Sequence, residues 1–283
     1  MTAVAASSPD MKALEAKVQG SSFYAAMKMM SPRQRAAMFA IYAFCREVDD
    51  IADDLKGDRT ERALALEAWR RDIAALYSGG EPGQAAFLAA AVESFGLEQA
   101  DFVAVIDGMA MDVAGDIVAP DRLTLDLYCD RVASAVGRLS VKVFGMEDKA
   151  GIALSHHLGR ALQLTNILRD LDEDAGIGRL YLSRESLAAA GIAATDPAAV
   201  IADPRIDMAA QVIAATARVH YAAADKVMKA ARKGDLRAPR LMRAAYGLIL
   251  RRMQAAGWSA PRRRVSLGKL EKLWVVLRHG LMA

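Results

Sequence analysis

The chain has 283 residues, a formal net charge of +3, 54% hydrophobic residues, 6% aromatic residues and 8 prolines. This length allows one large domain or two small ones, and an alanine-rich, proline-poor composition favours packed helices over sheets. A charge so close to zero argues against a nucleic-acid partner, and no apolar run reaches the roughly 20 residues that a membrane-spanning helix needs. We therefore predict one all-α domain and expect any membrane contact to be peripheral.

The N-terminus and the cysteines indicate the compartment. Residues 1–9 lack the basic start and apolar core of a secretory signal, so we interpret them as part of a loose arm. Cys45 and Cys129 each lie within an apolar helical pattern, which favours free thiols over a disulfide. Both observations predict a cytoplasmic protein.

The first long helix is predicted to begin at Ser31, which can cap it, with Pro32 at the first helical position and Gln34 closing a capping box. An apolar stripe from Ala37 to Leu55 continues this helix to a break at Gly57. Turn residues separate the later elements, and the two Asp-Pro steps within 194–204 predict a break there. Further helices are predicted over 60–77, 84–95, 99–113, 122–145, 149–175, 206–233, 237–256 and 266–280.

Carboxylates gather on one face near the end of the first long helix. Asp49 and Asp53 are one turn apart, so they repel each other unless a cation lies between them. Helical steps back along the same face reach Arg46 and Tyr42. For this stripe alone, solvated surface charge is an equal interpretation.

A second polar stripe follows steps of three and four near the end of the predicted helix 149–175. It contains Gln163, Asn166, Asp170 and Asp174, with Arg169 beside it. Mg²⁺ takes oxygen ligands and is usually held by one or two carboxylates together with the phosphates of a substrate. Two such faces could clamp one diphosphate, and their pairing makes plain surface charge a weaker explanation.

Several motifs occur together with these acidic stripes. They are SSFY at 21–24, YAFCREVDDIAD at 42–53, YCDRVA at 128–133, QLTNILRD at 163–170 with a further acid at 174, and RLY at 179–181. In their identity, order and separation the motifs resemble the squalene and phytoene synthase family. The resemblance implies a single-domain isoprenoid synthase helical bundle around a central cavity, over residues 20–283, after an arm and a first short helix over 1–19.

The resemblance also implies roles for individual residues. The metal ligands it implies, for Mg²⁺ or alternatively Mn²⁺, are Asp49, Asp53, Asn166, Asp170 and Asp174. The catalytic residues it implies, near the reacting carbons or the diphosphate, are Tyr42, Arg46, Tyr128, Arg169 and Tyr181. The further substrate-binding residues it implies are Ser21, Ser22, Phe23, Val132, Ala133, Gln163, Asn166, Tyr246 and Arg263.

The run VASAVG at 132–137 departs from the Val-Ala-Gly form common in carotenoid-making members and looks more like the bacterial presqualene diphosphate synthases of the hopanoid route. The expected reaction joins two farnesyl diphosphates head to head and releases diphosphate, without NADPH. Alternatives are phytoene or dehydrosqualene synthesis, or complete squalene synthesis with NADPH. A non-catalytic helical scaffold is the alternative from another class, and downstream isoprenoid enzymes are expected partners of an active enzyme.

Two remaining features receive plainer interpretations. His156, His157, His220 and His279 show no metal-ligand spacing and are predicted to be structural or surface residues. The predicted last helix, 266–280, has an apolar side and basic residues elsewhere, so it could rest on the inner face of an anionic membrane or pack into the core.

Overall fold

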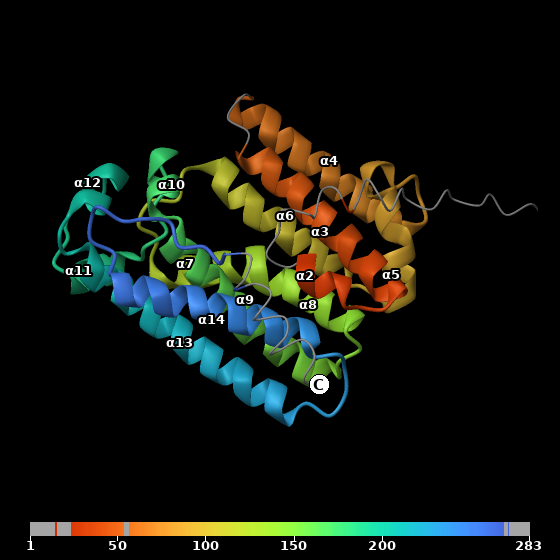
Figure 1. The fold of residues 1–283 in the computed structure, drawn as a ribbon. Helices are drawn as coiled ribbons and strands as arrows, with labels where there is room; N and C mark the ends of the chain where they lie inside the picture. Colours follow the sequence, from red (N-terminus) through yellow and green to blue (C-terminus); the bar gives the residue numbers. More distant parts are fainter. Residues whose placement is uncertain (1–14, 16–23, 54–56, 269–270, 272–283) are drawn as a thin grey trace, which may run out of the picture.

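Helices form nearly all of the regular structure in Figure 1, a computed structural model that describes residues 15, 24–53, 57–268 and 271. No strand occurs within these ranges, where the only sheet-like contact is a backbone bridge between Val118 and Leu180. The all-α prediction is confirmed. The helices are α2 (Tyr24–Lys28), α3 (Pro32–Asp53), α4 (Arg59–Ser78), η1 (Gly83–Leu88), α5 (Ala89–Phe95), α6 (Gln99–Ala114), α7 (Arg122–Cys129), η2 (Asp130–Ser134), α8 (Ala135–Val143), α9 (Asp148–Arg169), α10 (Leu171–Gly176), α11 (Arg184–Ala189), α12 (Pro197–Ala202), α13 (Ile206–Ala230) and α14 (Arg237–Ala256).

Helix α3 begins as its sequence predicts. The Ser31 hydroxyl accepts a hydrogen bond from the Gln34 backbone N–H, and the Gln34 side chain accepts one from the Ser31 backbone N–H, both at 3.4 Å. The apolar stripe of α3 is buried, and Phe44 packs edge-on against Trp69 of α4 and Phe102 of α6. Burial of this stripe fixes which face of α3 remains for the polar residues.

The predicted helix over 122–145 is three elements, because a π-helical turn, η2, separates α7 from α8. The predicted helix over 149–175 breaks at Asp170, whose backbone leaves helical geometry between α9 and α10. The predicted break over 194–204 contains a short helix that was not predicted, because Asp196 caps α12 and Pro197 occupies its first turn. Helix α11 was not predicted.

Close approaches through glycine hold η2 against its neighbours. A Cβ on Gly159 of α9 would lie 2.7 Å from the Cα of Ser134, and one on Gly108 of α6 would lie 2.6 Å from Val132 Cγ1. Only residues without a side chain permit such contacts. The two glycines therefore position the π-helical turn between α6 and α9.

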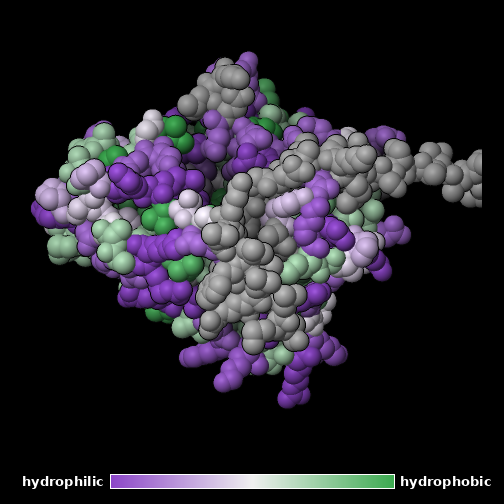
Figure 2. All heavy atoms as spheres, viewed as in Figure 1, coloured by the Kyte–Doolittle hydropathy of each residue, from purple (hydrophilic) through white to green (hydrophobic). Residues whose placement is uncertain are grey.

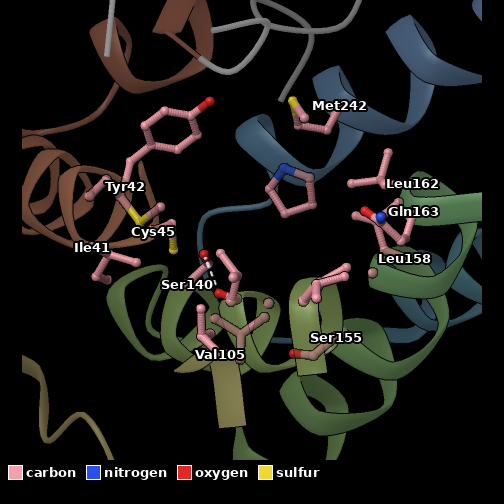
Figure 3. Close-up of a pocket in the computed structure, with 18 of the residues that line it drawn as sticks. Ile41, Tyr42, Cys45, Val105, Ser140, Ser155, Leu158, Leu162, Gln163 and Met242 are labelled. Carbon is pink, nitrogen blue, oxygen red and sulfur yellow. Dashed lines mark hydrogen bonds between the residues drawn. The ribbon is translucent and has the colours of Figure 1, made fainter. Parts of the chain in front are cut away.

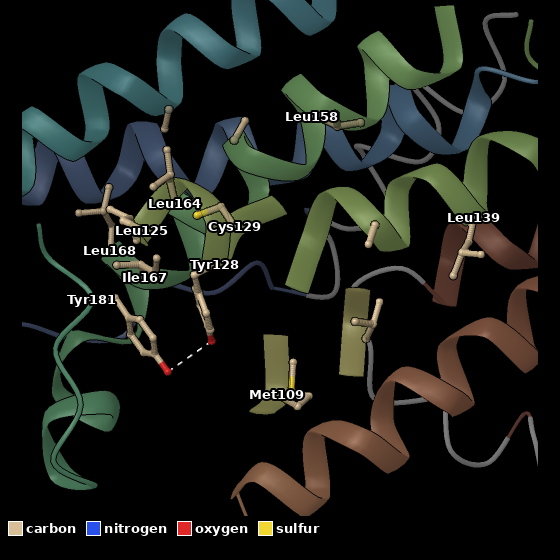
Figure 4. Packing of buried hydrophobic residues seen from close by; sticks show 14 of the residues in the cluster. Met109, Leu125, Tyr128, Cys129, Leu139, Leu158, Leu164, Ile167, Leu168 and Tyr181 are labelled. Atoms are coloured by element: carbon tan, nitrogen blue, oxygen red, sulfur yellow. Dashed lines mark hydrogen bonds between the residues drawn. The ribbon is translucent and has the colours of Figure 1, made fainter. Parts of the chain in front are cut away.

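Helix α9 lies in the middle of the bundle and packs on α8, α13, α14 and η2 (Figure 1). The buried apolar residues form one continuous cluster, part of which appears in Figure 4. On the face in Figure 2, hydrophilic side chains dominate among the described residues. Within the described part of the chain, no helix combines the length and apolarity needed to cross a membrane.

Some of the sequence predictions concern residues outside the described ranges. All of 1–23 except Glu15 lies outside the described residues, so the division between arm and domain at 19 and 20 stays a prediction. Most of the predicted helix 266–280 is likewise outside them.

Candidate active site

A cavity of about 340 Å³ lies between α3, α6, η2, α8, α9 and α14. This volume is within the usual range for small-molecule sites, roughly 300–1,000 Å³. Figure 3 shows Tyr42 of α3 facing Gln163 of α9 across the cavity, with Met242 of α14 on a third side. The central cavity expected from the sequence is therefore present.

The cavity is polar at one end and apolar at the other. Along both α3 and α9, the lining residues change from apolar to polar towards the C-terminal end of the helix. The polar end is lined by Tyr42, Arg46, Asp49, Gln163, Asn166 and Tyr246. Two serines, Ser140 and Ser155, also line the cavity, but their hydroxyls donate to backbone carbonyls of their own helices. Apolar lining residues include Met38, Ile41, Val105, Val132, Val136 and Leu158. This arrangement suits an elongated molecule with a charged head and a hydrocarbon tail.

The first acidic stripe lies on the cavity side of α3. Arg46 pairs with Asp49 at 3.3 Å and with the exposed Asp50 at 3.0 Å. Burial, followed by the negative charge of Asp53 one turn away, raises the pKa of Asp49 to about 6. The helical spacing thus produces the carboxylate repulsion that the sequence predicts.

The second stripe lies at the junction of α9 and α10. Burial alone would raise the pKa of Asp170, but hydrogen bonds from Arg169 at 2.8 and 2.5 Å and from Arg264 at 2.8 Å lower it. Asp174 has no comparable compensation. Burial, and then the charge of Asp170, raises the pKa of Asp174 to about 7.

Arg179 joins the two stripes. Its guanidinium donates to Asp53 Oδ1 at 2.7 Å and to the Ala52 carbonyl at 3.0 Å, while its backbone N–H donates to the Asp174 carbonyl at 2.9 Å. The charge of Asp53 contributes to the raised pKa of Asp174, which places both acids in one electrostatic environment. Arg179 therefore links the C-terminal end of α3 to the C-terminal part of α10.

Behind these acids, Asp112 of α6 is buried and accepts hydrogen bonds from two tyrosines. Tyr128 donates to it at 3.0 Å and Tyr181 at 2.7 Å, and the two rings stack with their centroids 4.9 Å apart (Figure 4). Burial raises the pKa of Asp112 and of both phenols, which keeps the tyrosines protonated as donors.

The described donors suit a hard divalent cation. Asn166 Oδ1 is buried and has no hydrogen-bond partner among the described residues, so its lone pairs can coordinate a cation. Burial first, and then the charge of a neighbouring carboxylate, raises the pKa of Asp49 and of Asp174, and a bound cation would stabilise the ionised form of both. Carboxylate and amide oxygens in this setting fit Mg²⁺ or Mn²⁺.

The sequence of this chain is similar to those of known proteins. The sequence model of the squalene/phytoene synthase family matches residues 16–271. This chain belongs to the squalene/phytoene synthase family. It is 58% identical over 271 residues to the presqualene diphosphate synthase of Zymomonas mobilis, covering 96% of this chain and 93% of that relative. It is 53% identical over 274 residues to the presqualene diphosphate synthase of Rhodopseudomonas palustris, covering 97% and 98%.

The fold of the family is also found in the solved structures. A dehydrosqualene synthase crystallised with a ligand superposes with a TM-score of 0.82 at 24% identity, covering 95% of this chain and 94% of the other. The expected isoprenoid synthase fold is confirmed.

The predicted site residues differ in their relation to the cavity. Among them, Tyr42, Arg46, Asp49, Val132, Ala133, Gln163, Asn166 and Tyr246 line the cavity. Three predicted metal ligands, Asp53, Asp170 and Asp174, are not among the residues that line it. The buried Tyr128 and Tyr181 contact Asp112 and are outside the lining. Arg169 lies beside Tyr246, whereas Arg263 is exposed. Ser21, Ser22 and Phe23 lie outside the described residues.

Three residues at this site were not predicted: Asp112, Arg179 and Arg264. Asp112 is a charge within an otherwise apolar helix segment, which is a usable sequence signal. Arg179 precedes a predicted tyrosine in the RLY motif, and Arg264 is next to the predicted Arg263. Their roles depend on contacts across the fold, which helical spacing does not reveal.

Proposed function

We propose that this chain joins two molecules of farnesyl diphosphate into presqualene diphosphate and releases one diphosphate. The observation that carries the proposal is the cavity, because its polar end is lined by Asp49 of the first stripe and by Gln163 and Asn166 of the second, and its other end is apolar. The presqualene diphosphate synthases that it resembles over nearly their full length support the choice of reaction within the family.

The proposed reaction balances without a redox partner. Loss of diphosphate from one substrate leaves an allylic cation, which the double bond of the second substrate attacks to form a carbon–carbon bond. Loss of one proton then closes the cyclopropane. Two farnesyl diphosphates thus give presqualene diphosphate, diphosphate and one proton, so the proposal includes no NADPH.

We assign the metal site to residues from both stripes. The proposed ligands are Asp49, Asp53, Asn166, Asp170 and Asp174. Bound Mg²⁺ would supply Lewis acidity and positive charge to the departing diphosphate. Asn166 contributes the unpartnered amide oxygen, and the carboxylates contribute hard anionic donors.

We assign the binding of the diphosphate oxygens to basic side chains around these acids. Arg46 lines the cavity, while Arg169 is held against Asp170 by two hydrogen bonds. Arg264 donates to the same carboxylate from the segment after α14. Fixed cations of this kind stabilise negative charge that develops on a leaving group. Arg263, Ser21 and Ser22 stay predicted substrate contacts.

The apolar part of the cavity would shelter the carbocation from water. Val132 and Ala133 reach it from η2, and Leu158 and Leu162 from α9. Cys45 belongs to this lining as a neutral thiol, because burial raises its pKa to about 12. Exclusion of water prevents capture of the cation as an alcohol.

Product identification tests the proposal. The chelator-treated protein is incubated with farnesyl diphosphate or, separately, with geranylgeranyl diphosphate, each with and without Mg²⁺ and NADPH, and the products are separated and identified by mass. We expect presqualene diphosphate in the presence of Mg²⁺, whether or not NADPH is added. Squalene formed only with NADPH, dehydrosqualene from farnesyl diphosphate, phytoene from geranylgeranyl diphosphate, or no diphosphate release would each contradict it. Cytoplasmic location and peripheral membrane contact stay predictions.

A further inference from the structure

Three of the four histidines of the chain come together where α9 packs along α13 (Figure 1). His156 and His157 are neighbours on α9, and His220 comes from α13. Ring nitrogens of all three lie within 4.8 Å of one another. Sequence spacing did not predict this cluster, because one ligand comes from a helix more than sixty residues away.

The cluster is separate from the active-site cavity. The residues of α9 that line the cavity include Leu158, Gly159 and Leu162, which form one stripe of the helix. His156 and His157 are absent from that lining. About 100° of rotation per residue places His157 nearly opposite the stripe and His156 beyond its edge.

We propose that His156, His157 and His220 form a binding site for a divalent transition-metal ion such as Zn²⁺, which joins α9 to α13. Imidazole nitrogen is a preferred ligand for Zn²⁺, whereas Mg²⁺ prefers oxygen. Water would complete a four-coordinate site with three protein ligands.

The geometry of the cluster is close to that of such a site. Zinc–nitrogen bonds of about 2.0–2.1 Å in tetrahedral geometry place two ligand nitrogens about 3.3 Å apart. The Nδ1 atoms of His157 and His220 are 3.1 Å apart. His156 is exposed, so its ring can change rotamer without disturbing the core.

The electrostatic environment is compatible with a cation. Arg160 is the nearest permanent positive charge on α9, and Asp126 binds it through two hydrogen bonds, at 2.7 and 2.9 Å. Asp130 accepts a third from Arg160 at 3.0 Å. These acids offset part of the guanidinium charge, although Arg160 still lowers the pKa of the neighbouring histidine rings.

The rings also carry the protonation state that a metal requires. Burial, followed by the neighbouring His157 and His156, lowers the pKa of His220 to about 4. Burial and then Arg160 lower the pKa of the other two rings. Neutral imidazoles have a free nitrogen lone pair, as ligation demands.

Equilibrium dialysis of untagged, chelator-treated protein against Zn²⁺ tests this site. Excess Mg²⁺ is present throughout so that carboxylate sites are already occupied, and bound zinc is measured by elemental analysis. We expect one Zn²⁺ per chain, with at least a tenfold loss of affinity in H157Q and in H220Q. H279Q changes the remaining histidine and serves as the matched control, with wild-type affinity expected.

The unfolding temperature, measured with and without Zn²⁺, tests whether the ion stabilises the contact between α9 and α13. Zn²⁺ at about a hundredfold excess over its dissociation constant should raise the unfolding temperature of the wild type by several degrees, and that of H157Q by much less. If H157Q and H220Q fail to fold, H156Q at the exposed position replaces them. Absence of stoichiometric zinc binding, or wild-type affinity in the variants of the cluster, would overturn the proposal and leave a simple hydrogen bond between His157 and His220.

Discussion

Because the pKa values of Asp174 and Asp49 are raised in the folded protein, we predict that the metal-free protein loses stability as the pH rises. The folded protein raises the pKa of Asp174 from 3.8 to about 7, so it holds this proton more tightly than the unfolded chain does. A group of this kind contributes stability that is fully present below about pH 4 and is lost as the pH rises through about 7. Asp49 contributes with the same sign, up to about pH 6.

The size of the effect follows from these pKa values. A change from 3.8 to about 7 corresponds to about 4 kcal/mol at full strength. Asp174 is only partly buried, so solvent screening reduces its contribution to about 1–2 kcal/mol. The Asp49 side chain is 41% exposed, which reduces its share further. For a chain of this size we expect a change of about 2–6 °C in unfolding temperature.

The assay compares thermal unfolding of chelator-treated wild type, D174N and D172N at about pH 5 and about pH 8. D172N is the matched control, because Asp172 belongs to the same short helix but pairs with Arg262. The wild type and D172N should lose more stability between the two pH values than D174N does. Mg²⁺ should restore more stability at the higher pH. An equal pH dependence in D174N and the wild type would refute the reasoning.

Three further substitutions test other parts of the structure. D49N should slow Mg²⁺-dependent diphosphate release roughly a hundredfold or more, whereas D50N at the exposed neighbouring position should stay within about threefold, and equal losses would contradict the assignment. D112N weakens two buried hydrogen bonds from tyrosines and should lower the free energy of unfolding in urea by about 1–3 kcal/mol, so unchanged stability would contradict it. G159A forces a Cβ against Ser134 and should cost about 1–3 kcal/mol in the same assay, in contrast to G176A, where the new Cβ meets nothing within 4 Å.

Much of the fold could be predicted from helical periodicity and capping. The capping box at Ser31 and the buried stripe of α3 are local features, and the structure has both. The breaks at η2 and Asp170 were missed because the apolar pattern continues through them, while the close approach of Gly159 that fixes η2 depends on a distant helix. Asp196-Pro197 was interpreted as a turn, although the same pair is a good helix start.

The site shows the same division between local and distant information. Spacing alone placed Asp49 with Asp53, and Asn166 with Asp170, on common helix faces. The link through Arg179, the buried partner Asp112 and the histidine cluster all require residues from separate helices to meet. Such contacts have no period in the sequence, so only the folded structure reveals them.

The central claim is that both acidic stripes together hold the metal ions and the diphosphate. A crystal structure with Mn²⁺ and a farnesyl thiodiphosphate analogue tests it most directly, because anomalous scattering locates Mn²⁺ without ambiguity. We predict manganese ions in contact with carboxylates from α3 and with Asn166 or Asp170 from the α9–α10 junction, with the hydrocarbon tail among the apolar residues of the cavity. Ions bound to one stripe alone, or a diphosphate bound outside the polar end, would contradict the account.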